Sequence, residues 1–200
     1  MPSWLKPDVL RRKTVKMAAL LCLPLAWQIA CPSPAQAEPG IAVEAAHARI
    51  EHDIYLVDAR LHYELSEEAR QALESGIPLL FAVEVEFRKH RPYLWDAVAA
   101  DSRHWLRLEY HALSRSYLVS NLTIKTRQSF PQLQEALEAL GTIRNMAVVE
   151  RQLLDANAHY EARLNARLDI ESLPAPLRPA AYFESAWRIK SPPYQWALTP

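Results

Sequence analysis

Glycine and cysteine are scarce in this chain, which has only 3 Gly and 2 Cys among 200 residues. Three glycines are too few for most of the glycine-rich loops that cradle phosphate groups. Neither sign of charge predominates, because 23 basic and 23 acidic residues give a formal net charge of +0. Proteins that bind nucleic acids through bulk attraction to phosphate carry an excess of basic residues. We therefore expect no nucleic-acid partner.

The amino terminus has the pattern of a secretory signal peptide. Five basic residues between Lys6 and Lys16 precede an apolar run from Met17 to Ala30, and the small-residue pattern Ala35-x-Ala37 follows. Basic segment, apolar run and cleavage pattern in this order predict a signal peptide over residues 1–37 and cleavage after Ala37. We therefore predict a periplasmic protein whose mature part, residues 38–200, is a single domain.

An uncleaved anchor in the inner membrane is the alternative to cleavage. A membrane-spanning helix needs about 18 or more apolar residues. The run from Met17 to Ala30 has 14 residues and is interrupted by Pro24. Length therefore favours a cleaved signal over an anchor.

Both cysteines, Cys22 and Cys31, lie in the predicted signal peptide. The mature form then has none, which excludes thiol catalysis, thiolate zinc sites, iron–sulfur clusters and a disulfide-linked partner. Residues 1–37 also hold five basic residues and one acidic residue, so residues 38–200 keep 18 basic and 22 acidic residues and a net charge of −4. The mature chain is mildly acidic.

Alternation of apolar and polar residues dominates the rest of the sequence and predicts antiparallel strands with one solvated face. The alternation is strongest over 55–65, 77–87 and 160–170. Weaker strands are predicted over 41–50, 106–112, 116–126, 143–153 and 187–198. The 41–50 segment is expected to pair with 54–65 across a short turn, and a change of parity near Asn121 predicts a β-bulge.

Two short helices are predicted between the strands. The first follows Ser66, a good N-cap, and ends near Gly76. The second has a capping-box spacing from Ser129 to Gln132, then apolar residues with helical spacing from Leu133 to Leu140, and Gly141 closes it. The prolines between 174 and 179 predict a stiff connector.

These elements predict a mainly β fold, an antiparallel β-sandwich with an immunoglobulin-like layout and two short helices. An up-and-down barrel with an internal ligand cavity is the alternative.

Motifs for catalysis and metal binding are missing from the sequence. There is no G-x-S-x-G, and the seven histidines form no H-x-H or H-E-x-x-H pair. We therefore expect no enzymatic activity, no metal ion and no cofactor. A hydrolase of unrecognised type remains an alternative.

The segment from Arg88 to Asp96 is the candidate binding surface. It joins basic or potentially basic residues to two aromatic ones in a predicted loop, a combination that suits an anionic headgroup, a glycan or a partner protein. The candidate site residues are Arg88, Lys89, His90, Arg91, Tyr93 and Trp95. The competing interpretation, which packing statistics favour, is that Trp95 fills the end of the sandwich while the cations are solvated.

Several short motifs resemble the exported family called domain of unknown function 4390. The motifs are Gly76-Ile77-Pro78-Leu79, Arg91-Pro92-Tyr93-Leu94-Trp95-Asp96, Tyr110-His111-Ala112-Leu113-Ser114-Arg115, Leu168-Asp169 followed by Leu173-Pro174, and the closing Trp187-x-Ile189-x-Ser191 with Trp196. The resemblance runs from about Ile41 to Pro200. It implies an exported proteobacterial protein whose genes often lie beside a nitrogen-regulation-type sensor kinase, and it implies no activity, cofactor or catalytic residue.

The sequence therefore predicts a periplasmic, non-enzymatic binding or accessory module. An inner-membrane sensor or another envelope protein is the expected partner, by the association that the resemblance implies. A barrel-like carrier of a small apolar ligand is the alternative function.

Overall fold

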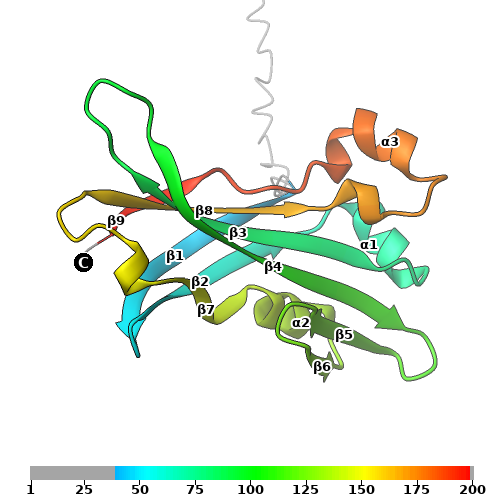
Figure 1. The fold of residues 1–200 in the computed structure, drawn as a ribbon. Coiled ribbons are helices and arrows are strands. Elements are labelled where there is room, and N and C mark those ends of the chain that lie inside the picture. Colours follow the sequence, from blue (N-terminus) through cyan, green and yellow to red (C-terminus); the bar gives the residue numbers. More distant parts are fainter. Residues whose placement is uncertain (1–38, 199–200) are drawn as a thin grey trace, which may run out of the picture. The chain divides into compact units, whose positions relative to one another are not determined.

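Over residues 39–198, nine strands form two antiparallel sheets that pack face to face (Figure 1). The structure is a computed structural model and describes residues 39–198. The smaller sheet has the strand order β1-β2-β7, and the larger has the order β6-β5-β4-β3-β8-β9. The strands are β1 (Gly40–Glu51), β2 (Ile54–Glu64), β3 (Leu79–Lys89), β4 (Ala97–His111), β5 (Ser116–Asn121), β6 (Thr126–Phe130), β7 (Thr142–Glu150), β8 (Tyr160–Leu168) and β9 (Tyr194–Leu198).

Short helices lie between the strands. They are α1 (Glu67–Glu74), α2 (Leu133–Leu140) and α3 (Arg178–Phe183), with single 3₁₀ turns η1 (Arg151–Leu153), η2 (Ile170–Ser172) and η3 (Ser185–Trp187). Within residues 39–198 no helix is long and apolar enough to cross a membrane. The predicted signal peptide and the predicted mature start at Glu38 lie outside the described residues.

The β1–β2 hairpin has the pairing that the sequence predicts. Ile50 pairs with Tyr55 and Glu51 with Ile54. His52 and Asp53 form the turn with φ angles of 51° and 61°. Two consecutive residues with positive φ match the type I′ turn, whose twist suits a two-residue hairpin.

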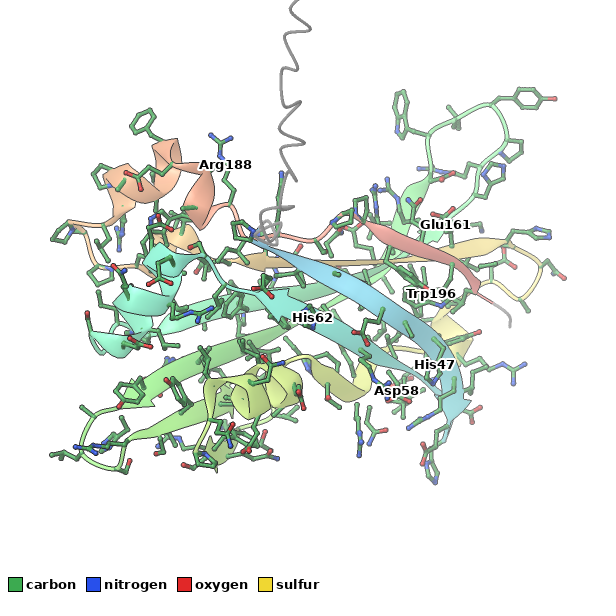
Figure 2. The ribbon with its side chains drawn as sticks, turned by 180° about the vertical axis from the view of Figure 1, so that it is seen from behind. His47, Asp58, His62, Glu161, Arg188 and Trp196 are labelled. Carbon is green, nitrogen blue, oxygen red and sulfur yellow. The ribbon has the colours of Figure 1, made fainter. Side chains whose placement is uncertain are left out.

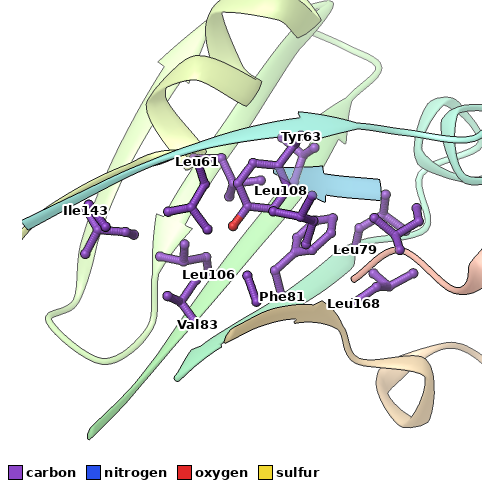
Figure 3. Packing of buried hydrophobic residues seen from close by; sticks show 14 of the residues in the cluster. Leu61, Tyr63, Leu79, Phe81, Val83, Leu106, Leu108, Ile143 and Leu168 are labelled. Carbon is purple, nitrogen blue, oxygen red and sulfur yellow. The ribbon is translucent and has the colours of Figure 1, made fainter. Parts of the chain in front are cut away.

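The core lies between the two sheets (Figure 3). Every second residue of β2 and β3 points into it, and Tyr63 meets Phe81 edge to face at 5.1 Å between ring centroids. A second such pair, Tyr55 and Phe87, joins the sheets at 5.6 Å. These are favourable aromatic geometries. The Tyr63 hydroxyl is buried with no hydrogen-bond partner among the described residues.

The prediction of a mainly β sandwich is confirmed, because two antiparallel sheets pack together without closing into a barrel. The barrel alternative is therefore wrong. The sheets hold three and six strands, and β3 to β6 follow one another as a meander within one sheet. This distribution differs from the four and three strands of an immunoglobulin constant domain.

Helix α1 begins and ends as predicted. The Ser66 hydroxyl accepts a hydrogen bond from the Ala69 N–H at 3.0 Å, and Gly76 follows the helix with φ of 84°. The buried side of the helix is formed by Ala69, Ala72 and Leu73.

Helix α2 differs from its prediction at its start. Ser129 does not cap it, because Ser129 lies in β6 and pairs with Leu118. Gln132 is the N-cap residue and makes no side-chain capping bond. At the other end, Gly141 has an ordinary φ of −77°, and its carbonyl accepts a hydrogen bond from the Leu61 N–H at 2.8 Å. Gly141 thus allows close packing rather than a left-handed turn.

The bulge predicted near Asn121 is wrong, because the chain turns back there to form the β5–β6 hairpin. The Asn121 side-chain oxygen accepts hydrogen bonds from the N–H groups of Thr123 and Ile124, at 3.0 and 3.2 Å. Lys125 has φ of 57°. Asn commonly forms turns in this way, so the parity change marked a turn.

The carboxy-terminal part confirms one prediction and corrects another. β9 lies at the edge of the larger sheet after Pro192-Pro193, as predicted for an interrupted strand. The expected connector at 174–179 instead runs into α3, which has Pro179 in its first turn. Proline fits that position because its missing N–H has no partner in a helix start.

Candidate functional site

The loop 90–96 joins β3 to β4 and projects from the sandwich (Figure 1). Tyr93 is 104% exposed, Leu94 60% and Trp95 83%. Tyr93 also has φ of 68°, in the left-handed region that non-glycine residues seldom adopt. The interpretation of Trp95 as a plug for the end of the sandwich is therefore wrong. Three neighbouring apolar side chains face solvent at the tip of this loop.

One ion pair and one backbone hydrogen bond tie the base of the loop to the body of the domain. The Lys89 ammonium donates to Asp155 at 2.9 Å, and this hydrogen bond raises the pKa of Lys89 and lowers that of Asp155. His90 Nδ1 lies 3.2 Å from Asp96 Oδ1. The backbone N–H of His90 donates to the carbonyl of His159 at 2.9 Å.

The six candidate residues thus fall into two groups. Arg88 pairs with Glu86 at 3.7 Å, so Arg88, Lys89 and His90 belong to the base. Tyr93 and Trp95 belong to the tip. Arg91 lies between the groups and forms no ion pair with the described residues.

A groove of about 360 Å³ runs beside the base of the loop, over one face of the paired strands β8 and β9. His90 and Asp96 line it from the loop, and Glu161 and Trp196 line it from the two strands (Figure 2). The Trp196 ring lies against Tyr194 with centroids 5.9 Å apart. This groove extends the loop surface toward the edge of the larger sheet.

A second pocket, of about 450 Å³, lies under the β4–β5–β6 meander, where α2 meets β7. His104 of β4 faces it and is only 5% exposed. Burial lowers the pKa of His104 below its ordinary value, so the ring is neutral at pH 7.

The hydrogen bonds around His104 fix its tautomer. The Asn121 side-chain oxygen already accepts two backbone N–H groups, which turns the Asn121 amide NH₂ toward His104 Nδ1 at 3.3 Å. Nδ1 accepts this hydrogen bond, so Nε2 carries the ring proton. Nε2 has no hydrogen-bond partner among the described residues. Nε2 is not among the fully buried side-chain atoms that lack a partner, so its N–H is open to the pocket as an unused donor.

A third polar cluster lies on the outer face of the smaller sheet (Figure 2). The Asp58 carboxylate accepts the Asn145 N–H at 2.7 Å and pairs with Arg49 at 3.2 Å and His47 at 3.6 Å. These contacts occupy both carboxylate oxygens, so Asp58 is poorly placed to act as a base. Over residues 39–198 no three His, Cys, Asp or Glu side chains converge as metal ligands would.

A family model described as a domain of unknown function (DUF4390) matches residues 38–197. The chain belongs to the DUF4390 family. Comparison with curated proteins and with solved structures gives no match. Membership confirms the resemblance seen in the sequence motifs, and the family description assigns no activity.

Sequence reasoning missed the His104 pocket in this DUF4390 domain, although a signal was present. His104 has the same parity as Leu106 and Leu108, which are buried, so the alternation extended backwards places the imidazole inside. His62 and His111, by contrast, are exposed as predicted. Parity would have identified the buried histidine, but the pocket beside it is formed partly by α2 and β7, which are remote in sequence.

Proposed function

We propose that this DUF4390 chain is an exported, non-enzymatic binding module of the cell envelope that docks on a partner protein through its β3–β4 loop. The observation that carries the proposal is the exposure of Tyr93, Leu94 and Trp95 on one projecting loop. Side chains so exposed contribute little to the domain's own packing. Trp and Tyr are also the residue types that most often dominate the energy of protein interfaces.

The base of the loop supports this role. The ion pair of Lys89 with Asp155 and the backbone bond from His90 to His159 hold the base of the loop against the domain, and the contact of His90 with Asp96 closes the loop on itself. A loop held before binding loses less conformational freedom on binding, which favours affinity. Arg91 adds a cation near the aromatic tip, and arginine is likewise enriched in interface hot spots.

The sequence supports the location and the class of partner. Residues 1–37 have the order of features of a signal peptide. The family resemblance links the protein to sensor kinases through neighbouring genes, which favours a membrane-embedded sensor as the partner. The carboxylates of Asp58 and Glu84 are each held in ion pairs with arginine side chains. A carboxylate paired in this way is poorly placed to act as a general base, which favours a binding role over hydrolysis.

Site-specific photo-crosslinking tests the proposal. A photoreactive phenylalanine analogue replaces Leu94 in the full chain, expressed in its native cells. The matched control places it at Leu113, which is 94% exposed in the β4–β5 turn. We expect position 94 to give an adduct with an inner-membrane protein at least about tenfold more abundant than the adduct from position 113.

Two readouts decide the outcome. Equal adducts from both positions, or adducts with no envelope protein, would overturn the loop as the binding surface. Intact mass of the same preparation tests export separately, because cleavage after Ala37 leaves a chain that starts at Glu38. A chain that keeps residues 1–37 in the membrane fraction supports the anchor instead.

A further inference from the structure

The pocket beneath the β4–β5–β6 meander combines an apolar wall with a set of hydrogen-bond donors. Leu106, Leu140 and Ile143 form part of the wall and are all at least nine-tenths buried. The unused Nε2–H of His104 faces the same space. Because Nε2 is not among the fully buried atoms that lack a partner, its N–H is open to the pocket, where a ligand oxygen can accept its hydrogen bond.

The charge in the pocket has one sign. Arg144 of β7 lines it, and Arg144 forms no ion pair with the described residues. No Asp or Glu of the described residues lines the pocket. The site therefore offers one guanidinium and a neutral imidazole donor, and no carboxylate competes with an incoming anion.

We propose that this pocket binds a small amphipathic carboxylate, with Arg144 and His104 donating to the carboxylate and the apolar wall contacting a short alkyl chain. The planar guanidinium fork matches the two oxygens of a carboxylate. One cation balances the single charge of a carboxylate, whereas a phosphate dianion would leave a charge uncompensated. A volume of about 450 Å³ lies in the ordinary range for small-molecule sites. This site is independent of the β3–β4 loop.

Titration of the ¹⁵N-labelled domain tests the proposal with sodium octanoate as the probe. Octylamine keeps the chain and reverses the charge, acetate keeps the carboxylate without the chain, and inorganic phosphate tests a general anion site. We expect octanoate to shift the amide signals of the pocket residues with a Kd of about 1 mM or lower. The other three probes should bind at least about tenfold more weakly.

Two variants separate the pocket from nonspecific binding. Arg144→Gln should weaken octanoate binding by about tenfold or more, because the charge-assisted hydrogen bonds are lost. Arg127→Gln is the matched control, because Arg127 donates to Ser120 and does not line the pocket. Both arginines are exposed, so the two variants should fold.

Several results would overturn the proposal. They are no binding of octanoate, equal binding of octylamine, equal effects of the two substitutions, or shifts confined to the aromatic loop. Crosslinking from position 94 should be unchanged by Arg144→Gln, so failure of the pocket and failure of the loop are told apart.

Discussion

Tyr63 places a hydroxyl among apolar side chains in the centre of the core (Figure 3). Burial raises the pKa of this hydroxyl, and the oxygen finds no hydrogen-bond partner among the described residues. Leaving such a group unsatisfied costs about 1–3 kcal/mol. We therefore expect Tyr63→Phe to raise the free energy of unfolding by about 1 kcal/mol, measured by urea denaturation.

Tyr55→Phe is the matched control for that measurement. Tyr55 makes the equivalent edge-to-face contact with Phe87, but it also lines a surface pocket. Its hydroxyl is not among the buried polar atoms that lack a hydrogen-bond partner. Its replacement should change stability less. A loss of stability in Tyr63→Phe would contradict the prediction.

His104 makes stability depend on pH in a defined direction. Its folded-state pKa is lowered by burial, whereas an unfolded histidine has a pKa of about 6.5. Below about pH 6.5 the unfolded chain binds a proton that the folded chain does not, so His104 destabilises the fold as the pH falls. Well above pH 6.5 neither the folded nor the unfolded chain binds this proton, so the destabilising effect of His104 is absent.

The variant His104→Gln isolates this effect, because glutamine does not titrate and the other six histidines stay. We expect the free energy of unfolding of the native chain to fall more between pH 7 and pH 5 than that of the variant. Urea denaturation at several pH values measures the difference. Parallel pH curves for the two proteins would show that His104 does not titrate on unfolding.

At the scale of elements, the end of α2 is joined to β2 by backbone contact. A Cβ atom added to Gly141 would lie 1.9 Å from the Leu61 carbonyl oxygen, so helix and strand would have to separate. The same movement breaks the bond from Leu61 N–H to Gly141. We expect Gly141→Ala to destabilise the fold by about 2–3 kcal/mol in thermal or urea denaturation.

Gly76→Ala provides the comparison. Gly76 has φ of 84° but nothing within 4 Å of an added Cβ, so the cost is backbone strain alone, about 1–2 kcal/mol. The expected order is that Gly141→Ala costs more, although only Gly76 has positive φ. The reverse order would refute the close contact between α2 and β2.

Local sequence predicted the elements wherever one signal was decisive. Ser66 capped α1 and the alternation of β2 and β3 gave their buried faces, because both effects act over a few residues. Ser129 had the spacing of a cap, but pairing with Leu118 drew it into β6. Asn121 changed the parity, and its side-chain bonds produced a turn where a bulge was expected.

At the scale of the whole molecule, pairing of distant strands could not be predicted from local pattern. β7 joins β2 and β8 joins β3, and neither partner is its neighbour in sequence. The same limit applied to the candidate site. The sequence grouped six residues because they are close together in the chain, whereas the structure divides them into a base and a tip. Asp155, from a distant segment, pairs with Lys89 at the base of the loop, and Trp95 at the tip is exposed to solvent.

The pairing of β2 with β7 sets when the smaller sheet can be completed during synthesis. Ile54 pairs with Glu150, which is 96 positions later in the chain. In a chain that emerges amino terminus first, the β1–β2 hairpin forms early and keeps one edge open until β7 has emerged. An open strand edge is a template for association with other chains. The interval between β2 and β7 is therefore the stage at which a nascent chain most needs a chaperone.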